Sequence, residues 1–279
     1  MRIDVMKTYK LFINGSFPRS ESGRVYEITD SKGKFLANPC LGSRKDLRES
    51  VVSARNSHQG WSSASAFNRG QILYRVAEIM QGRADQFIAE IIAQEGATPA
   101  AAKVQVQSAI DTWVWYAGWC DKIEAISGSS NQVSGPFYNF SIPESLGVIA
   151  IFADAKPSLL NLVSGLAPVI ASGNTAILIA NEKFPLCAIT LAECLATSDV
   201  PAGVVNILTG KFDQFVTWAG SHMDIDGIDA SGLNSTQEKE ARIAGADNLK
   251  RISSFKDGAS PQRVLAFMEN KTVSHPIGL

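Results

Sequence analysis

The sequence predicts an α/β protein built on a Rossmann-like, doubly wound parallel sheet. From residue 147 onward, short apolar runs typical of buried strands alternate with longer segments of helical periodicity. That alternation is typical of parallel sheets with helices on both faces. The chain has 279 residues, of which 45% are hydrophobic, and this is enough for a sizeable core.

The first part of the chain is expected to form short strands and then helices. Residues 10–30 alternate in polarity and contain Asn-Gly and Ser-Gly turn signals, which favour short strands or a hairpin. A helix is predicted to start after Ser43 as its cap, and two amphipathic helices follow with a break near Gly82. A fourth helix is predicted over 99–126, because a proline at its start suits the first turn.

The second part of the chain carries the predicted sheet. A polar, alternating stretch broken by Gly135-Pro136 is interpreted as an exposed hairpin, which needs something to pair with. The predicted strands after it cover 147–153, 175–180, 203–210, 224–230 and 248–255. The predicted helices between them cover 157–173, 185–200, 212–221 and 234–246.

Composition excludes several classes of function. The net charge of −1 gives no electrostatic attraction to nucleic acid or to an anionic membrane. The start of the chain lacks signal-peptide features, and no apolar run is long enough to span a bilayer. Four scattered cysteines indicate free thiols in a reducing cytoplasm. The three histidines are isolated from other ligand types, so no metal site is expected.

The order of these segments resembles the NAD(P)-dependent aldehyde dehydrogenase superfamily. The resemblance is carried by "LFINGSF", "WYAGWCDKIEAI", "APVIASGNTAILIANEKFPL", "VPAGVVNILTG" and "NLKRISSFKDGASP". It implies a cofactor-binding-like domain over 1–132 and 147–262. It also implies an oligomerisation hairpin over 133–146 that is completed by a C-terminal strand within 263–279. The family's reaction uses a cysteine thioester, hydride transfer to the cofactor and a glutamate-assisted hydrolysis.

The resemblance marks three cofactor-binding positions, each in an altered setting. The family's K-P-x-E ribose motif reads Ile179-Ala180-Asn181-Glu182 here, so only Glu182 remains. The F-T-G-S turn that faces the pyrophosphate reads Ala230-Ser231-Gly232-Leu233, which keeps Gly232. Gly210 borders the adenine pocket in the family, although a turn glycine also explains it. An acid such as Glu182 before a helix is equally suited to the helix dipole. NAD(P) binding is therefore expected to be weak or absent.

The resemblance also predicts that the catalytic groups are missing. Ala155 stands where the family's P-W-N-F-P motif supplies an oxyanion-binding asparagine, and Phe255 stands where L-E-L-G-G supplies the general base. No cysteine follows Cys194. The segment "GASP" leads directly into "VLAFMENKTV", which is similar to the family's last strand, so the catalytic domain is expected to be absent. We therefore predict no catalytic residue.

Three functions remain open from the sequence. The first is a non-catalytic subunit that assembles with a full-length aldehyde dehydrogenase through 133–142, 265–277 and the helix at 235–244. A homodimer is the other possible assembly. The second is an NAD(P)-linked oxidoreductase that acts on aldehydes by a different mechanism. The third is a stand-alone nucleotide-binding module.

Overall fold

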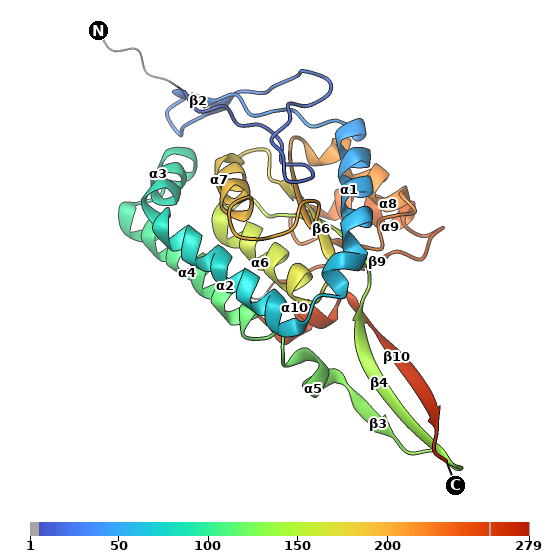
Figure 1. Ribbon diagram of the computed structural model, residues 1–279. Helices are drawn as coiled ribbons and strands as arrows, with labels where there is room; N and C mark the ends of the chain where they lie inside the picture. Colours follow the sequence, from blue (N-terminus) through green and yellow to red (C-terminus); the bar gives the residue numbers. More distant parts are fainter. Residues whose placement is uncertain (1–5, 257, 279) are drawn as a thin grey trace.

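A five-stranded parallel sheet lies at the centre of the protein (Figure 1). The computed structural model describes residues 6–256 and 258–278. The central strands are β5 (Val148–Phe152), β6 (Thr175–Ala180), β7 (Val205–Thr209), β8 (Gly227–Asp229) and β9 (Arg251–Ser253). Their spatial order is β7-β6-β5-β8-β9, and every neighbouring pair is parallel. The chain therefore winds outward from β5 in both directions, which confirms the predicted doubly wound sheet.

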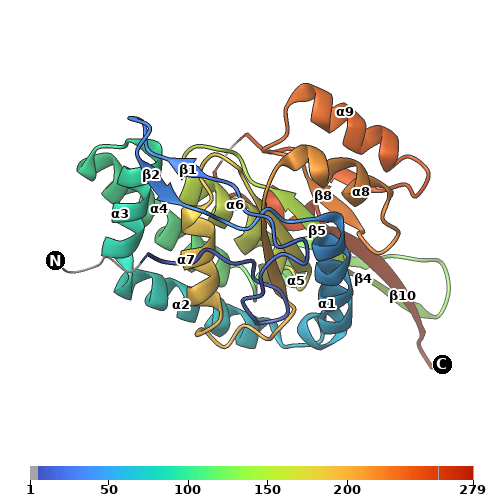
Figure 2. The ribbon, with the colours of Figure 1, turned by 90° about the horizontal axis from the view of Figure 1, so that it is seen from above.

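Helices cover both faces of this sheet (Figure 2). One face packs against α1 (Arg44–Ser62), the turn η1 (Phe212–Gln214), α8 (Val216–Ser221) and α9 (Ser235–Ala244). The other face packs against α2 (Ala66–Gly82), α3 (Ala84–Glu95), α4 (Pro99–Ala117), α6 (Ser158–Ala171) and α7 (Leu186–Leu195).

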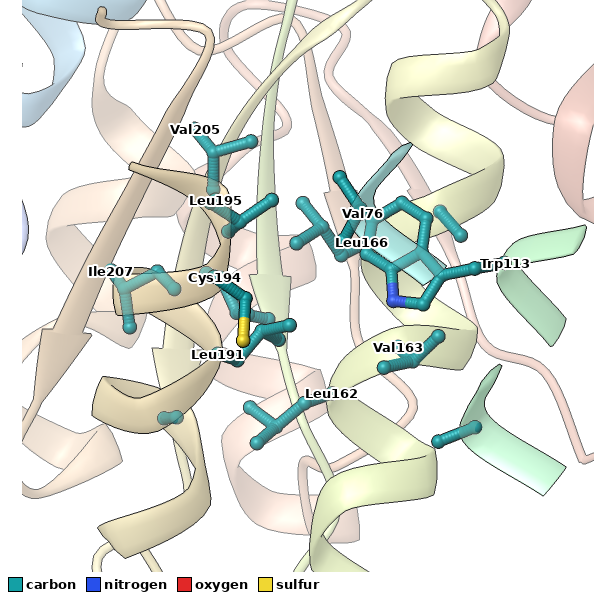
Figure 3. Close-up of a cluster of buried hydrophobic side chains, with 14 of the residues drawn as sticks. Val76, Trp113, Leu162, Val163, Leu166, Leu191, Cys194, Leu195, Val205 and Ile207 are labelled. Carbon is teal, nitrogen blue, oxygen red and sulfur yellow. The ribbon is translucent and has the colours of Figure 1, made fainter. Parts of the chain in front are cut away.

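The covering helices explain why the strands are continuous apolar runs rather than alternating ones. Every residue of β5, β6 and β7 is buried. In β5, Ile149 and Ile151 join the core on the α6 side, whereas Val148 and Phe152 join the core on the α1 side. Strands buried on both faces carry apolar residues at nearly every position. Figure 3 shows the core on the α6 side of the sheet, where side chains of α2, α4, α6 and α7 meet those of β7.

The sequence located most helix ends correctly. Ser43 caps α1 through a capping box with Asp46, and α2 ends at Gly82 as predicted. The helix expected over 99–126 is instead two helices, α4 and the short α5 (Ile123–Ser127). After Gly118 the amides of Trp119 and Lys122 bond to carbonyls three residues back, and this pattern ends the α-helical ladder. The N-terminal strands are short, β1 (Ile28–Thr29) and β2 (Phe35–Ala37).

A second, antiparallel sheet projects from the body of the protein (Figure 1). It consists of β3 (Ser129–Asn131), β4 (Phe137–Ser145) and β10 (Met268–Pro276), which follows the short helix α10 (Pro261–Leu265). The order is β10-β4-β3, and β10 pairs with β4 along its whole length, from Met268 opposite Ser145 to Pro276 opposite Phe137. Two segments far apart in the sequence thus build one sheet.

The base of the projecting sheet is tied to the core through one buried amide. The side chain of Asn174 accepts from the Gly147 amide at 2.7 Å and donates to the Phe267 carbonyl at 2.8 Å. These contacts join the loop before β5 to the residue before β10. Among the described residues, no helix is long and apolar enough to cross a membrane. The division of the chain into domains stays a prediction.

Candidate functional site

The loops beyond the carboxyl ends of the parallel strands are where this type of sheet binds ligands. Here these loops border two cavities. The first, the β6 groove, has a volume of about 570 Å³ and is lined by Tyr26–Ser31, Gln94, Glu95, Lys156, Glu182–Phe184 and Lys211. The second, the switch-point cavity, has a volume of about 460 Å³ and lies where the chain directions from β5 and β8 diverge. Its lining comes from the loop after β5, the first turns of α6, the end of β8, the loop after β9, and α10.

Glu182 lies just beyond the end of β6 and lines the β6 groove. The phenol of Tyr26 lines the same groove, and its oxygen is buried without a hydrogen-bond partner among the described residues. Burial raises the pKa of Tyr26, and the charge of Glu182 adds to that rise. A buried hydroxyl without a partner next to a carboxylate has the capacity to bind the hydroxyl groups of a ligand.

Gly210 serves the packing of the chain after β7. Its φ of +145° is a conformation that residues with a side chain rarely adopt. A Cβ at this position would lie 3.2 Å from the Gly42 amide nitrogen and 3.3 Å from the ring of Phe215. The neighbouring Thr209 carbonyl accepts a 2.8 Å hydrogen bond from Gly42. The close approach at Gly210 is therefore to the protein itself, and Gly210 lines neither cavity.

Gly232 also makes a close approach to protein backbone. Its amide donates to the Phe152 carbonyl at 2.9 Å. A Cβ here would lie 2.5 Å from the carbonyl carbon of Ala153 and 2.6 Å from the amide nitrogen of Asp154. The turn after β8 thus packs directly on the turn after β5. The structure does not bring Glu182, Gly210 and Gly232 into one cavity.

The switch-point cavity contains a buried acid and a buried base that do not pair directly. Asp229 ends β8 and is 2% exposed, and Arg263 of α10 is 6% exposed. Asp229 accepts hydrogen bonds from the amide and the hydroxyl of Ser231 at 2.9 and 2.5 Å, both on Oδ1. Burial raises the pKa of Asp229, whereas the bonds from Ser231 and the charge of Arg263 oppose the rise.

The guanidinium of Arg263 is only partly satisfied. Its Nη1 donates to the Ser164 carbonyl at 2.8 Å, and its Cζ lies over the ring of Phe255, 4.8 Å from the ring centroid. Its Nε is buried with no hydrogen-bond partner among the described residues. The sequence analysis missed both Asp229 and Arg263. An acid at the end of an apolar strand was a usable signal for Asp229, but nothing in the local pattern around Arg263 places it at the cavity.

The helix starts at this edge of the sheet are already capped by protein groups. Asn234 and Gln237 form a capping box at the start of α9, where the Asn234 side chain accepts from the amides of Thr236 and Gln237. At the start of α6, the carboxylate of Glu95 accepts from the amide of Ser158 at 2.9 Å. A helix start binds phosphate through free amide groups. In these two helices, internal acceptors take up part of that capacity.

The fold and the order of its loops match one family. The family model for the aldehyde dehydrogenase family matches residues 17–275. This chain belongs to that family. A mitochondrial 10-formyltetrahydrofolate dehydrogenase from Mus musculus is 29% identical over 259 residues, which are 91% of this chain and 28% of that protein. Retinal dehydrogenase 2 from Homo sapiens is 30% identical over 267 residues, which are 94% of this chain and 51% of that protein.

Solved structures show the same fold. An NAD-dependent aldehyde dehydrogenase from Sinorhizobium meliloti aligns with a TM-score of 0.82 at 20% identity, over 89% of this chain and 50% of that one. The NAD+ complex of an aldehyde dehydrogenase from Bacillus cereus aligns with a TM-score of 0.82 at 22% identity, over 88% and 50%. This chain therefore spans about half, or less, of the length of the relatives that it matches.

In this aldehyde dehydrogenase-family chain, the two residues that the sequence resemblance matches to reactive positions are apolar. Ala155 follows β5 and offers no side-chain donor. Phe255 follows β9, and its ring packs edge-on against Phe267 at a centroid distance of 6.2 Å. Its amide donates to the Ser231 hydroxyl at 2.9 Å. Phe255 thus holds the loop after β9 against the core and cannot accept a proton.

The four cysteines are all free and buried. Burial raises the pKa of Cys120 and of Cys194 to about 11 and raises that of Cys187 well above its ordinary value. A thiol with a raised pKa carries little thiolate at neutral pH, so these three are poor nucleophiles. They pack as small apolar groups, as Cys194 does in Figure 3.

His58 and His222 lie on different elements, and each has its own hydrogen-bond partner. His58 bonds to the Ser145 hydroxyl at 3.0 Å, and the Nδ1 of His222 accepts from the Asp224 amide at 3.2 Å. In the parts of the chain that the structure describes, no group of three or more His, Cys, Asp or Glu side chains is arranged to hold a metal ion.

Proposed function

We propose that this chain is a non-catalytic subunit of the aldehyde dehydrogenase family that assembles with a full-length aldehyde dehydrogenase. The observation that carries the proposal is the projecting sheet (Figure 1). β10 pairs with β4 along one edge, and within the described residues no strand pairs with its other edge. A long free strand edge is a template for another strand.

The faces of the projecting sheet also support a partner. Most residues of β10 are exposed, and on β4 the side chains of Phe137 and Tyr138 are exposed, Tyr138 by 50%. The rings of Tyr138 and Phe140 lie 5.6 Å apart and form an apolar strip on β4. Burying such a strip against a partner removes apolar surface from water.

The absence of catalysis is supported by the residues at the reactive positions. Ala155 cannot bind an oxyanion through a side chain, Phe255 cannot act as a base, and the cysteines are buried. Between β9 and β10 the structure contains the short helix α10, so the chain passes from the parallel sheet to the projecting sheet without a further domain between them.

We also propose that NAD(P) binds weakly. Glu182 and Tyr26 in the β6 groove suit ribose hydroxyl groups, but Ile179 is buried and offers no charge where the family motif has its lysine. The capped start of α9 and the packing of Gly232 on Ala153 leave little room for a pyrophosphate. A nucleotide held at the β6 groove alone is the alternative function, because Tyr26 has an unsatisfied buried oxygen there.

The experiment is a tagged pull-down of the intact chain from its own cells, followed by native mass spectrometry. We expect a full-length aldehyde dehydrogenase in fixed stoichiometry, recovered from the cytoplasmic fraction. Recovery of the chain only as a monomer or a homodimer would contradict the proposal. The same preparation is then titrated with NAD. A dissociation constant in the range usual for an active enzyme would overturn the proposal that NAD(P) binds weakly.

Two exposed tyrosines supply a test variant and a matched control variant for the pull-down. Tyr138→Asp places a charge on the apolar strip of β4 and should reduce recovery of the partner by about tenfold or more, equivalent to about 1.4 kcal/mol. Tyr74→Asp makes the same change on α2, where Tyr74 is 59% exposed, and should leave recovery unchanged. Equal loss in both variants would point away from the projecting sheet as the interface.

A further inference from the structure

The switch-point cavity has the size and the position in the fold of a small-molecule site. Its volume of about 460 Å³ lies within the range of about 300–1,000 Å³ found for small-molecule pockets. It lies at the carboxyl end of the sheet between β5 and β8, which is the topological switch point of this fold. It shares Lys156 with the β6 groove, and its lining includes Ser231 and Phe255, from the segments that the resemblance matches to the family's pyrophosphate turn and general base.

Two buried charged groups with free bonding capacity line this cavity. Asp229 receives two hydrogen bonds on Oδ1, and no donor among the described residues bonds to Oδ2, which can accept from a ligand. Arg263 donates once, from Nη1 to Ser164, and its buried Nε has no partner among the described residues. The two side chains do not form a direct ion pair, although the charge of Arg263 acts on Asp229. Buried polar groups left in this state are costly unless a further partner completes them.

The remaining lining defines the chemistry of that partner. Lys156 and Lys256 add positive charge to that of Arg263, whereas Asp154 and Asp229 are the acids, so the lining has an excess of cations. Arginine binds carboxylates through paired donors. The rest of the lining is mixed. Ile151, Leu160 and Phe255 supply apolar surface, and Asn161, Ser164 and Ser231 are polar.

We infer that the switch-point cavity binds a small α-hydroxy or α-amino carboxylate with an apolar tail. The ligand's carboxylate accepts hydrogen bonds from Arg263, and its hydroxyl or amino group donates to Oδ2 of Asp229. The tail lies against Leu160 and Phe255. This ligand satisfies both buried groups at once, which an inorganic anion or a plain carboxylic acid does not.

Three related probes test the inference on the purified full chain by isothermal titration calorimetry. Phenyllactate and phenylalanine carry both polar groups, whereas phenylpropionate lacks the donor next to its carboxylate. We expect saturable binding of phenyllactate or phenylalanine at least about tenfold tighter than that of phenylpropionate. No saturable binding of either probe up to about 20 mM, or equal affinity for all three, would overturn the inference.

Substitutions assign the contacts to residues. Arg263→Gln should weaken binding by about tenfold or more, and Asp229→Asn should reduce the preference over phenylpropionate to about threefold or less. Leu160→Trp fills part of the cavity without touching either charged group, so it serves if those variants fail to fold, and it should also weaken binding by about tenfold. Lys103→Gln, an exposed change on α4, is the control and should bind as the unmodified chain does. Unchanged affinity in both Arg263→Gln and Leu160→Trp would place the ligand elsewhere and overturn the inference.

Discussion

Gly232 lies directly against the peptide group of Ala153, so that a Cβ at Gly232 would be 2.5 Å from the Ala153 carbonyl carbon. This contact joins the turn after β8 to the turn after β5. It sets the distance between the two loops that border the switch-point cavity.

Gly232→Ala should therefore destabilise the protein. The added methyl meets backbone atoms that cannot rotate away, and overpacking of this kind typically costs about 1–3 kcal/mol. The measurement is the free energy of unfolding from urea denaturation. Gly60→Ala is the control, because a Cβ at Gly60 in α1 meets nothing within 4 Å and should leave stability equal or raise it by about 0.5–1 kcal/mol. A neutral Gly232→Ala would show that the two turns are not in contact in solution.

Asn174→Ala should loosen the base of the projecting sheet. The change leaves the Gly147 amide without its partner, and an unsatisfied buried group costs about 1–3 kcal/mol. It also removes one of the two donors to the Phe267 carbonyl, which keeps the Leu146 amide at 3.1 Å. Relative to the unmodified chain, Asn174→Ala should accelerate hydrogen exchange of the β10 amides more than that of the β6 amides. The exposed Asn38 provides the control substitution, Asn38→Ala, which should change neither. Equal acceleration throughout the chain would mean that Asn174 acts only on global stability.

The native thiols should be slow to react with a disulfide reagent such as DTNB near neutral pH. All four cysteines are buried, and burial raises the pKa of Cys120 and of Cys194 to about 11. All four should react at once in denaturant, which gives the reference amplitude. One rapidly reacting thiol in the native protein would contradict this prediction and reopen the question of a cysteine nucleophile.

Stability should depend on Lys250 at alkaline pH. Burial lowers the pKa of Lys250 from 10.5 to about 8 in the folded state. Between these two values the unfolded chain binds the extra proton, so stability rises with pH in that window, and Lys250 contributes no slope below it. The unmodified chain should gain stability relative to Lys250→Met as the pH rises through this window. Lys103→Met on exposed α4 is the control, and an identical slope in all three proteins would refute the prediction.

Much of the fold was predictable from sequence because helices and strands here follow local patterns. The strands of the central sheet are apolar runs bounded by turn residues, and the cap at Ser43 marks the start of α1. The helix break after Ala117 was not predicted, because the apolar periodicity continues through Trp119 and Ile123 while the backbone turns. Periodicity records which residues are buried and does not record whether the helix is continuous.

The candidate site was less predictable because it depends on contacts between distant residues. The sequence marks Gly232 as a turn glycine, but only the structure shows that its neighbour is Ala153 rather than open space. Arg263 reaches the switch-point cavity because α10 packs on α6, where its Nη1 meets the Ser164 carbonyl. No local pattern predicts that meeting.

The pairing of β4 with β10 has a consequence for how the protein is made. β4 leaves the ribosome before residues 146–267, and its partner strand comes only after them. During that interval the edge of β4 that will pair with β10 has no partner strand, and β4 carries the rings of Tyr138 and Phe140. Contacts between distant segments form late, and exposed strand edges are prone to aggregate. The longest strand pairing among the described residues is therefore one that cannot form until the end of synthesis.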